Sequence, residues 1–157
     1  MNWFAIAFPL TVPFWALMIL LPKWGRTSRI VASPLIVLPV LVAYFAAVAP
    51  ILPDFAAEML NPDLDGVRTL LSSDAGTSAV WAQVLAWDLF IGRWMYLDSR
   101  ARNIPSLIMS PLLVLTILLS PFAVVIYLGL RAFYQPAEES AGQSAGKTQE
   151  PAEQAAT

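Results

Sequence analysis

The fold is decided by the stretch Trp81-Ala-Gln-Val-Leu-Ala-Trp-Asp-Leu-Phe-Ile-Gly-Arg-Trp-Met-Tyr-Leu-Asp98. It is apolar and long enough to cross a bilayer, yet it carries a carboxylate near its centre, Asp88, and a guanidinium, Arg93, one to two turns further on. Within hydrocarbon a charged side chain costs roughly 3 kcal/mol or more, so such groups persist where they are paired, hydrated or used. We therefore expect a membrane helix over residues 79–97 and seek the function on it.

Three further stretches contain no Asp, Glu, Lys or Arg: residues 2–21, 30–52 and 107–130. Each is long enough for a helix to cross roughly 30 Å of hydrocarbon. Amphipathic helices of a water-soluble core would show polar faces at the helical period, and these stretches do not. The sequence therefore predicts an all-α integral membrane bundle of four transmembrane helices.

The charges in the connections predict the orientation of this bundle. Basic residues follow the first and third predicted spans: Lys23, Arg26, Arg29, Arg100 and Arg102. The connection over residues 53–78 is acidic and has one arginine: Asp54, Glu58, Asp63, Asp65, Asp74 and Arg68. Since Lys and Arg gather on the cytoplasmic side, both termini are expected outside the cytoplasm, in a lumen or periplasm. The mild negative net charge offers no basic patch, so no nucleic-acid partner is expected.

Two segments outside the spans have recognisable patterns. Asn61 suits a helix N-cap and Pro62 the first helical position, and apolar residues then share one face: Leu64, Val67, Leu70 and Leu71. This pattern predicts a short interfacial helix on the outer side. Residues 135–157 are a low-complexity, acidic mix that cannot bury enough apolar surface to fold. The folded domain should therefore cover residues 1–134, followed by a disordered tail.

The chain has no histidine and no cysteine, which excludes His-ligated di-iron, haem and common zinc sites and disulfides. We expect no metal site and no required cofactor. One face of the third span nevertheless suits a flat pigment, because aromatic rings there could stack on a polyene or macrocycle and an amide could bind its polar end: Gln83, Trp87, Phe90 and Trp94. A bound carotenoid or chlorophyll is the ligand this pattern indicates. The alternative is that such rings only anchor the helix at the membrane interface.

The charges of the third span need partners on other helices. Asp88 shares a face with Gly92, which would let another helix come close, whereas Arg93 lies about 140° around the axis from Asp88. The long Arg93 side chain could reach the headgroups, and the short Asp88 side chain could not. Asp88 is thus a candidate proton donor or acceptor. The structural alternative is a hydrogen bond between helices, to one of four hydroxyls: Tyr44, Ser110, Thr116 or Tyr127.

At these residues a family resemblance becomes visible. The run Trp81-Ala-Gln-Val-Leu-Ala-Trp-Asp-Leu-Phe-Ile-Gly-Arg-Trp94, followed by Tyr96, Asp98, Arg100 and a span beginning Pro105-Ser-Leu, resembles the signature of the neoxanthin synthase-like family, also called abscisic-acid-deficient-four-like proteins. The run Pro13-Phe-Trp-Ala-Leu-Met-Ile-Leu-Leu-Pro22 is similar to the family's first span, so the likeness covers about residues 3–134. Family members commonly have histidine where this chain has Gln83, and glycine where it has Ser120.

The resemblance implies a place in carotenoid metabolism. The family consists of small polytopic membrane proteins of plants, algae and photosynthetic bacteria, and its plant members are needed to make neoxanthin from violaxanthin. This implies a thylakoid or bacterial inner membrane. Conversion of an epoxide to an allenic alcohol is an isomerisation that needs an acid and a base but no metal. Asp88 could serve as the acid and base, with Arg93 or Tyr96 stabilising the alkoxide, and Asp98 at the boundary is a competing candidate because carotenoid rings lie near the interfaces.

Several functions therefore stay open at the level of sequence. The leading one is a membrane protein that isomerises a xanthophyll or presents it to an isomerase. The second is a non-catalytic subunit of a photosynthetic complex that binds pigment or lipid, and the third is a small transporter that uses Asp88. The expected partners are a carotenoid or other lipophilic pigment, membrane lipids, and subunits of a photosynthetic complex.

Overall fold

The computed structural model describes residues 2–134, and all regular structure in this range is helical. In chain order the elements are α1 (Trp3–Leu20), α2 (Gly25–Ala32), η1 (Pro34–Val37), α3 (Leu38–Val48), η2 (Ala49–Ile51), α4 (Leu52–Leu60), α5 (Leu64–Ser72), α6 (Asp74–Ala101) and α7 (Ser106–Phe133). The all-α prediction is confirmed for these residues, and the predicted disordered tail lies outside them.

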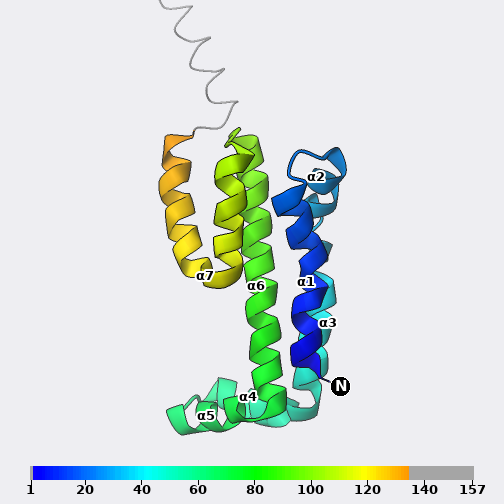
Figure 1. The fold of residues 1–157 in the computed structure, drawn as a ribbon. Helices are drawn as coiled ribbons and strands as arrows, with labels where there is room; N and C mark the ends of the chain where they lie inside the picture. Colours follow the sequence, from blue (N-terminus) through cyan, green and yellow to red (C-terminus); the bar gives the residue numbers. More distant parts are fainter. Residues whose placement is uncertain (1, 135–157) are drawn as a thin grey trace, which may run out of the picture.

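Helix α6 is the central element of the bundle. It runs from one end of the molecule to the other and packs against α1, α3 and α7 (Figure 1). Three other stretches are long and apolar enough to cross a membrane, judged by length and composition: Trp3–Leu20, Pro34–Leu60 and Ser106–Phe133. Because α6 lies between these apolar helices, its own polar side chains can face protein instead of lipid.

Helix α7 differs from the predicted fourth crossing, because it folds back on itself (Figure 1). Its helical geometry breaks at Leu119, where φ is −149° and ψ is 63°. Two residues later, Pro121 lacks the N–H that would continue the ladder, and its ring crowds the carbonyl four residues earlier. The chain therefore returns, and Arg102 just before α7 donates a hydrogen bond of 2.8 Å to the Tyr134 carbonyl just after it. Both ends of α7 lie at one end of the molecule, opposite to the N-terminal end of α1.

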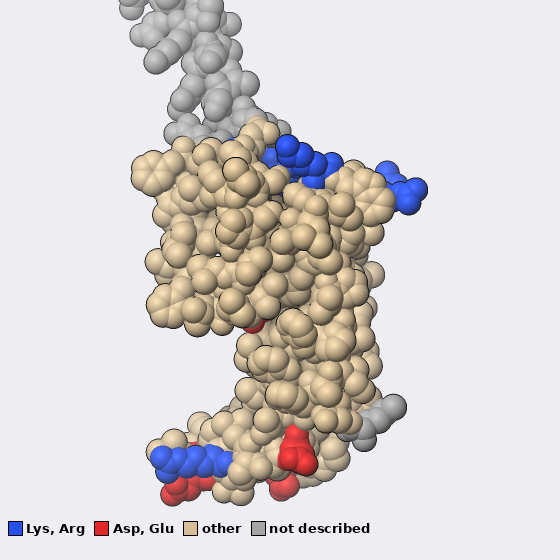
Figure 2. All heavy atoms as spheres, viewed as in Figure 1, with Lys and Arg blue, Asp and Glu red and all other residues tan. Residues whose placement is uncertain are grey.

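The two ends of the molecule differ in charge. Figure 2 shows Lys and Arg gathered at the end where α2 and the end of α6 lie, and Asp and Glu mainly on α4 and α5 at the other end. The segregation predicted from the sequence is therefore present. Which end faces the cytoplasm stays a prediction.

The outer connection contains two helices where one was predicted. Asn61 ends α4, and the N-cap of α5 is Asp63, whose carboxylate accepts hydrogen bonds from the backbone N–H groups of Asp65 and Gly66. The prediction that Asn61 caps this helix is thus corrected by two residues. Asp63 is the better N-cap, because its carboxylate accepts hydrogen bonds from two of the backbone N–H groups that the start of a helix leaves unpaired.

Close packing around α6 depends on small residues. Ala43 and Ala47 of α3 and Ala79, Ala82 and Ala86 of α6 are all buried, and α3 and α6 are packed together. On the face toward α1, the Trp15 indole lies directly over Gly92, so that a Cβ at Gly92 would come within 2.4 Å of a ring carbon. The predicted role of Gly92 in close helix approach is therefore confirmed.

We expect Gly92→Ala to destabilise the bundle by about 1–3 kcal/mol, because the added methyl group must displace the buried Trp15 ring. The matched control is Gly129→Ala on α7, where a Cβ would meet nothing within 4 Å. The measurement is the thermal unfolding midpoint of both variants in detergent. Equal midpoints would show that Trp15 does not pack on Gly92.

Candidate functional site

A groove between α3 and α6 gathers most of the predicted ligand-binding residues. It has a volume of about 350 Å³ and is lined by residues from η1, α3 and α6: Val37, Leu41, Tyr44, Gln83, Ala86, Trp87 and Phe90. The rings of Trp87 and Phe90 meet edge to face with centroids 6.2 Å apart, and 58% of Trp87 is exposed. The groove is therefore an open, mainly apolar channel with two aromatic rings on one wall and the Gln83 amide beside them.

Trp94, the fourth predicted binding residue, belongs to a different part of the structure. Its ring packs edge to face on Tyr127 of α7, with centroids 5.3 Å apart, and the Arg131 guanidinium lies 5.8 Å from its ring centroid. The returning half of α7 covers this part of the α6 face. Three of the four predicted binding residues thus line the groove, and the fourth, Trp94, is packed under α7.

Asp98 holds the returning half of α7 against α6. Its carboxylate accepts hydrogen bonds from the Tyr127 hydroxyl at 2.6 Å, from Arg131 Nε at 2.9 Å and from Arg102 Nε at 3.0 Å. We call these four residues the Asp98 cluster. Two guanidinium groups and a hydroxyl already occupy the carboxylate, so the geometry gives Asp98 a structural role and offers no support for its predicted catalytic one.

Arg93 and Tyr96 are bound to backbone carbonyls. Arg93 donates through Nε to the Val31 carbonyl at 2.8 Å and through a terminal nitrogen to the Ala32 carbonyl. These are the last carbonyls of α2, which a helix end leaves without partners. Tyr96 is buried, and its hydroxyl donates to the Pro22 carbonyl at 2.8 Å. Both side chains therefore fasten α6 to the connection after α1, and the expected reach of Arg93 into the headgroups is replaced by this contact.

Of the four residues predicted to act in catalysis, Asp88 alone forms no hydrogen bond or ion pair among residues 2–134. Three of the four expected partners bond elsewhere: Ser110 to the Ile19 carbonyl, Thr116 to the Leu112 carbonyl and Tyr127 to Asp98. The Ser120 hydroxyl, beside the break in α7, lies near the Asp88 carboxyl without a well-formed hydrogen bond to it.

The Asp88 carboxylate is also accessible. Only 7% of the residue is exposed, yet no side-chain oxygen or nitrogen in the described range is both buried and unpartnered. Part of the carboxylate therefore keeps a small exposed area, at the level where α7 bends. Figure 2 shows a hollow in the surface below this bend and above the acidic helices.

Two contributors were missed at the level of sequence. The sequence offers Tyr44 only as a partner for Asp88, whereas the structure places Tyr44 in the lining of the groove. Tyr44 is the one aromatic residue in residues 30–52 whose side chain has a polar atom, and this feature of the sequence could have indicated a binding residue. Ser120 was noted only as a departure from a usual glycine, and no sequence signal shows that a bend brings it to Asp88. Within residues 2–134, His, Cys, Asp and Glu form no group of three or more that could hold a metal ion.

Comparison with known proteins matches residues 2–127 to the family described as ABA DEFICIENT 4-like. The chain belongs to this family. It is also 29% identical over 107 residues to "Protein ABA DEFICIENT 4, chloroplastic" of Arabidopsis thaliana, a stretch that makes up 64% of this chain and 49% of the plant protein. The chain thus spans about half the length of that curated relative. No solved structure matches.

The family match includes both the groove and Asp88. It ends at Tyr127, so it also includes three members of the Asp98 cluster, Asp98, Arg102 and Tyr127, and excludes Arg131. The predicted family is confirmed, and the roles predicted for single residues of this ABA DEFICIENT 4-like protein stay predictions.

We expect Asp98→Asn to destabilise the protein by about 1–3 kcal/mol, because the guanidinium groups of Arg102 and Arg131 both lose the negative carboxylate with which they pair. The control is Asp65→Asn, which removes an ion pair of similar length to Arg68 whose two side chains are largely exposed. Exposed pairs contribute little, so the control should show no measurable loss. Thermal unfolding in detergent compares the two, and an equally stable Asp98→Asn protein would contradict the structural role of the cluster.

Proposed function

We propose that this ABA DEFICIENT 4-like protein binds a xanthophyll in the groove between α3 and α6, and presents the pigment for conversion of an epoxide end group to an allenic alcohol. The observation that carries this proposal is the groove itself. It combines an exposed aromatic wall of Trp87 and Phe90 with two polar side chains, Gln83 and Tyr44.

The dimensions of the groove suit part of a long, flat ligand. Gln83 and Phe90 are two turns apart on α6, about 10 Å of helix rise. A carotenoid that crosses the hydrocarbon layer extends over roughly 30 Å. The groove would therefore hold one section of the polyene by contact with the two rings, and the remainder would lie in lipid. Apolar pockets with a few placed polar groups are the usual form of small-molecule sites.

A second candidate function is the isomerisation itself, and it is favoured by the lack of a hydrogen-bond partner for the Asp88 carboxyl group. Arg93, Tyr96 and Asp98 are already held by carbonyls or ion pairs, whereas Asp88 is accessible and has no direct partner among the described residues. A single carboxyl group can balance the reaction. It gives its proton to the epoxide oxygen as the C–O bond opens, and the resulting carboxylate takes the vinylic proton as the allene forms.

The geometry supports binding more directly than catalysis. Asp88 follows Trp87 in the chain, so the side chain points about 100° around α6 from the aromatic wall. An epoxide ring would therefore have to leave the groove toward the bend of α7 in order to reach Asp88. Presentation of the pigment needs no such step, and for this reason it is the main proposal.

Binding is tested with Trp87→Ala. The purified protein is titrated with an epoxy-xanthophyll in lipid nanodiscs, and binding is followed by the circular dichroism that the bound pigment acquires in the visible range. Loss of one stacked ring should weaken binding roughly threefold to tenfold. Trp24→Ala is the control, because Trp24 is similarly exposed but lies outside the groove near α2. Absence of pigment binding by the wild-type protein, or equal affinities of the two variants, would overturn the proposal.

Catalysis is tested with Asp88→Asn in the same nanodiscs, with chromatography of the pigment after incubation. If Asp88 transfers the protons, the variant should still bind the xanthophyll but convert it about 100-fold or more slowly than wild type. Conversion at an unchanged rate would exclude Asp88 as the acid and base. Binding without any conversion by wild type would leave presentation as the function.

A further inference from the structure

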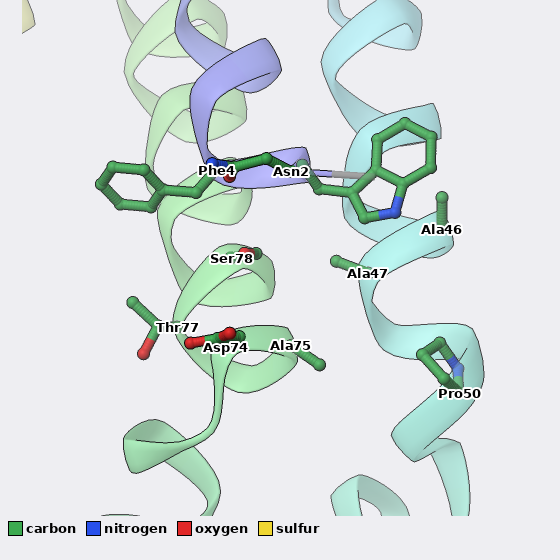
Figure 3. A pocket seen from close by; sticks show the side chains of 10 residues that line it. Asn2, Phe4, Ala46, Ala47, Pro50, Asp74, Ala75, Thr77 and Ser78 are labelled. Carbon is green, nitrogen blue, oxygen red and sulfur yellow. The ribbon is translucent and has the colours of Figure 1, made fainter.

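A second and larger cavity lies at the acidic end of the bundle, below the start of α1 and between the end of α3 and the start of α6 (Figure 3). Its volume is about 800 Å³. Its chemically active lining comes from α1 and α6: Asn2, Trp3, Phe4, Asp74, Thr77 and Ser78. None of these residues lines the groove, and the proposed function makes no use of them.

The cavity is separated from the groove by packed side chains. Ala47, Val48 and Ala79 form a small buried cluster between α3 and α6. Tyr44, which lines the groove, and Trp3, which lines the cavity, both pack against this cluster. A ligand in the groove therefore cannot extend into the cavity through the bundle, and the two are independent sites.

The polar groups of the cavity are available to a ligand. Ser78 is only 8% exposed, and its hydroxyl has no hydrogen-bond partner among residues 2–134. Since no side-chain oxygen in that range is both buried and unpartnered, this hydroxyl keeps some exposed surface, and Ser78 lines the cavity. Figure 3 shows the Asp74 side chain one turn before Ser78 on the same helix, and the side chain of Thr77, the residue directly before Ser78. The Thr77 hydroxyl is already bound to the Leu71 carbonyl, and the Asn2 side-chain oxygen accepts from the Ala5 N–H, so Ser78 and Asp74 have the side-chain oxygens left to bind.

The charge of the lining limits the ligand. Its described residues include the carboxylate of Asp74 and no lysine or arginine, so a phosphate group would meet repulsion that none of these side chains offsets. Hydroxyl groups, in contrast, can donate to the carboxylate and exchange hydrogen bonds with Ser78. Trp3 and Phe4 add flat apolar surface for a ring. The cavity lies at the acidic end, near the amphipathic helices α4 and α5, and helices of this kind lie at the depth of membrane headgroups.

We propose that this cavity binds the uncharged, hydroxyl-bearing ring of a membrane amphiphile, with ring hydroxyls bonded to Asp74 and Ser78 and the ring face against Trp3. Two sources have this chemistry: the sugar headgroup of a glycolipid, and the hydroxylated end ring of a xanthophyll. In both cases the apolar part of the molecule leaves the cavity into the lipid. The site does not depend on the pigment groove.

The test is native mass spectrometry of the full chain released from nanodiscs that contain equal amounts of a glucosyl diacylglycerol and phosphatidylglycerol. We expect wild-type protein to retain the glycolipid at least fivefold over the anionic lipid. A second set of nanodiscs replaces the glycolipid by a dihydroxy xanthophyll and its hydrocarbon counterpart. Selective retention in the first set identifies a headgroup site. Because the groove is also proposed to bind a xanthophyll, selective retention only in the second set identifies a ring site in the cavity when it is lost on substitution of Asp74 or Ser78.

Two variants keep the proposal falsifiable. Asp74→Asn changes an exposed residue and should leave folding intact while reducing the selective retention severalfold, and Ser78→Val should abolish it. Thr69→Val is the control, because the Thr69 hydroxyl bonds within α5 and lies outside the cavity. Trp87→Ala should also leave retention of the glycolipid unchanged, which separates this site from the groove. Equal retention of all lipids by wild type, or the same selectivity in Asp74→Asn and Ser78→Val as in wild type, would overturn the proposal.

Discussion

Helix α6 carries polar and charged side chains through an apolar bundle, and the arrangement of the other helices follows from the partners that these side chains require. Unpaired polar groups in hydrocarbon cost several kcal/mol, about as much as a folded domain can lose and remain folded. Arg93 pairs with the last carbonyls of α2, and Tyr96 with the Pro22 carbonyl. Asp98 pairs with Arg102, and with Tyr127 and Arg131 on the returning half of α7. The contacts near the basic end thus fix the helices on both sides of α6.

This arrangement leaves few groups free for chemistry. Of the four residues predicted to act in catalysis, three are engaged in contacts that hold the fold, and Asp88 alone is accessible without a direct partner in the described chain. The groove lies on one side of Asp88 and the bend of α7 on the other. A protein that binds and presents a flat pigment needs only the groove, whereas an isomerase also needs Asp88 to reach the bound ring.

The sequence predicted the parts of the fold that depend on local pattern. The apolar stretches, the segregation of charge between the two ends, the close approach at Gly92 and three of the four aromatic-face residues all follow from composition and helical spacing. The return of α7 could not be predicted, because residues 107–130 have the same hydropathy whether the helix is straight or bent. Its bend depends on a proline that bundles often tolerate and on Arg131 reaching Asp98, a contact between residues far apart in the chain. The unpredicted return of α7 also explains the error at Trp94. Helical spacing places Trp94 on the same face as the groove residues, and only the returning half of α7 covers it.

The claim that α7 returns to the end where it starts is tested most directly by thiol accessibility. The chain has no cysteine, so single cysteines can be placed at Gly25, Ser72 and Tyr134 without a background. Sealed vesicles of one orientation are treated with a membrane-impermeant thiol reagent. The structure predicts that Tyr134→Cys is labelled from the same side as Gly25→Cys, with Ser72→Cys labelled from the opposite side. Labelling of Tyr134→Cys together with Ser72→Cys would show that α7 crosses the membrane and would contradict the fold described here.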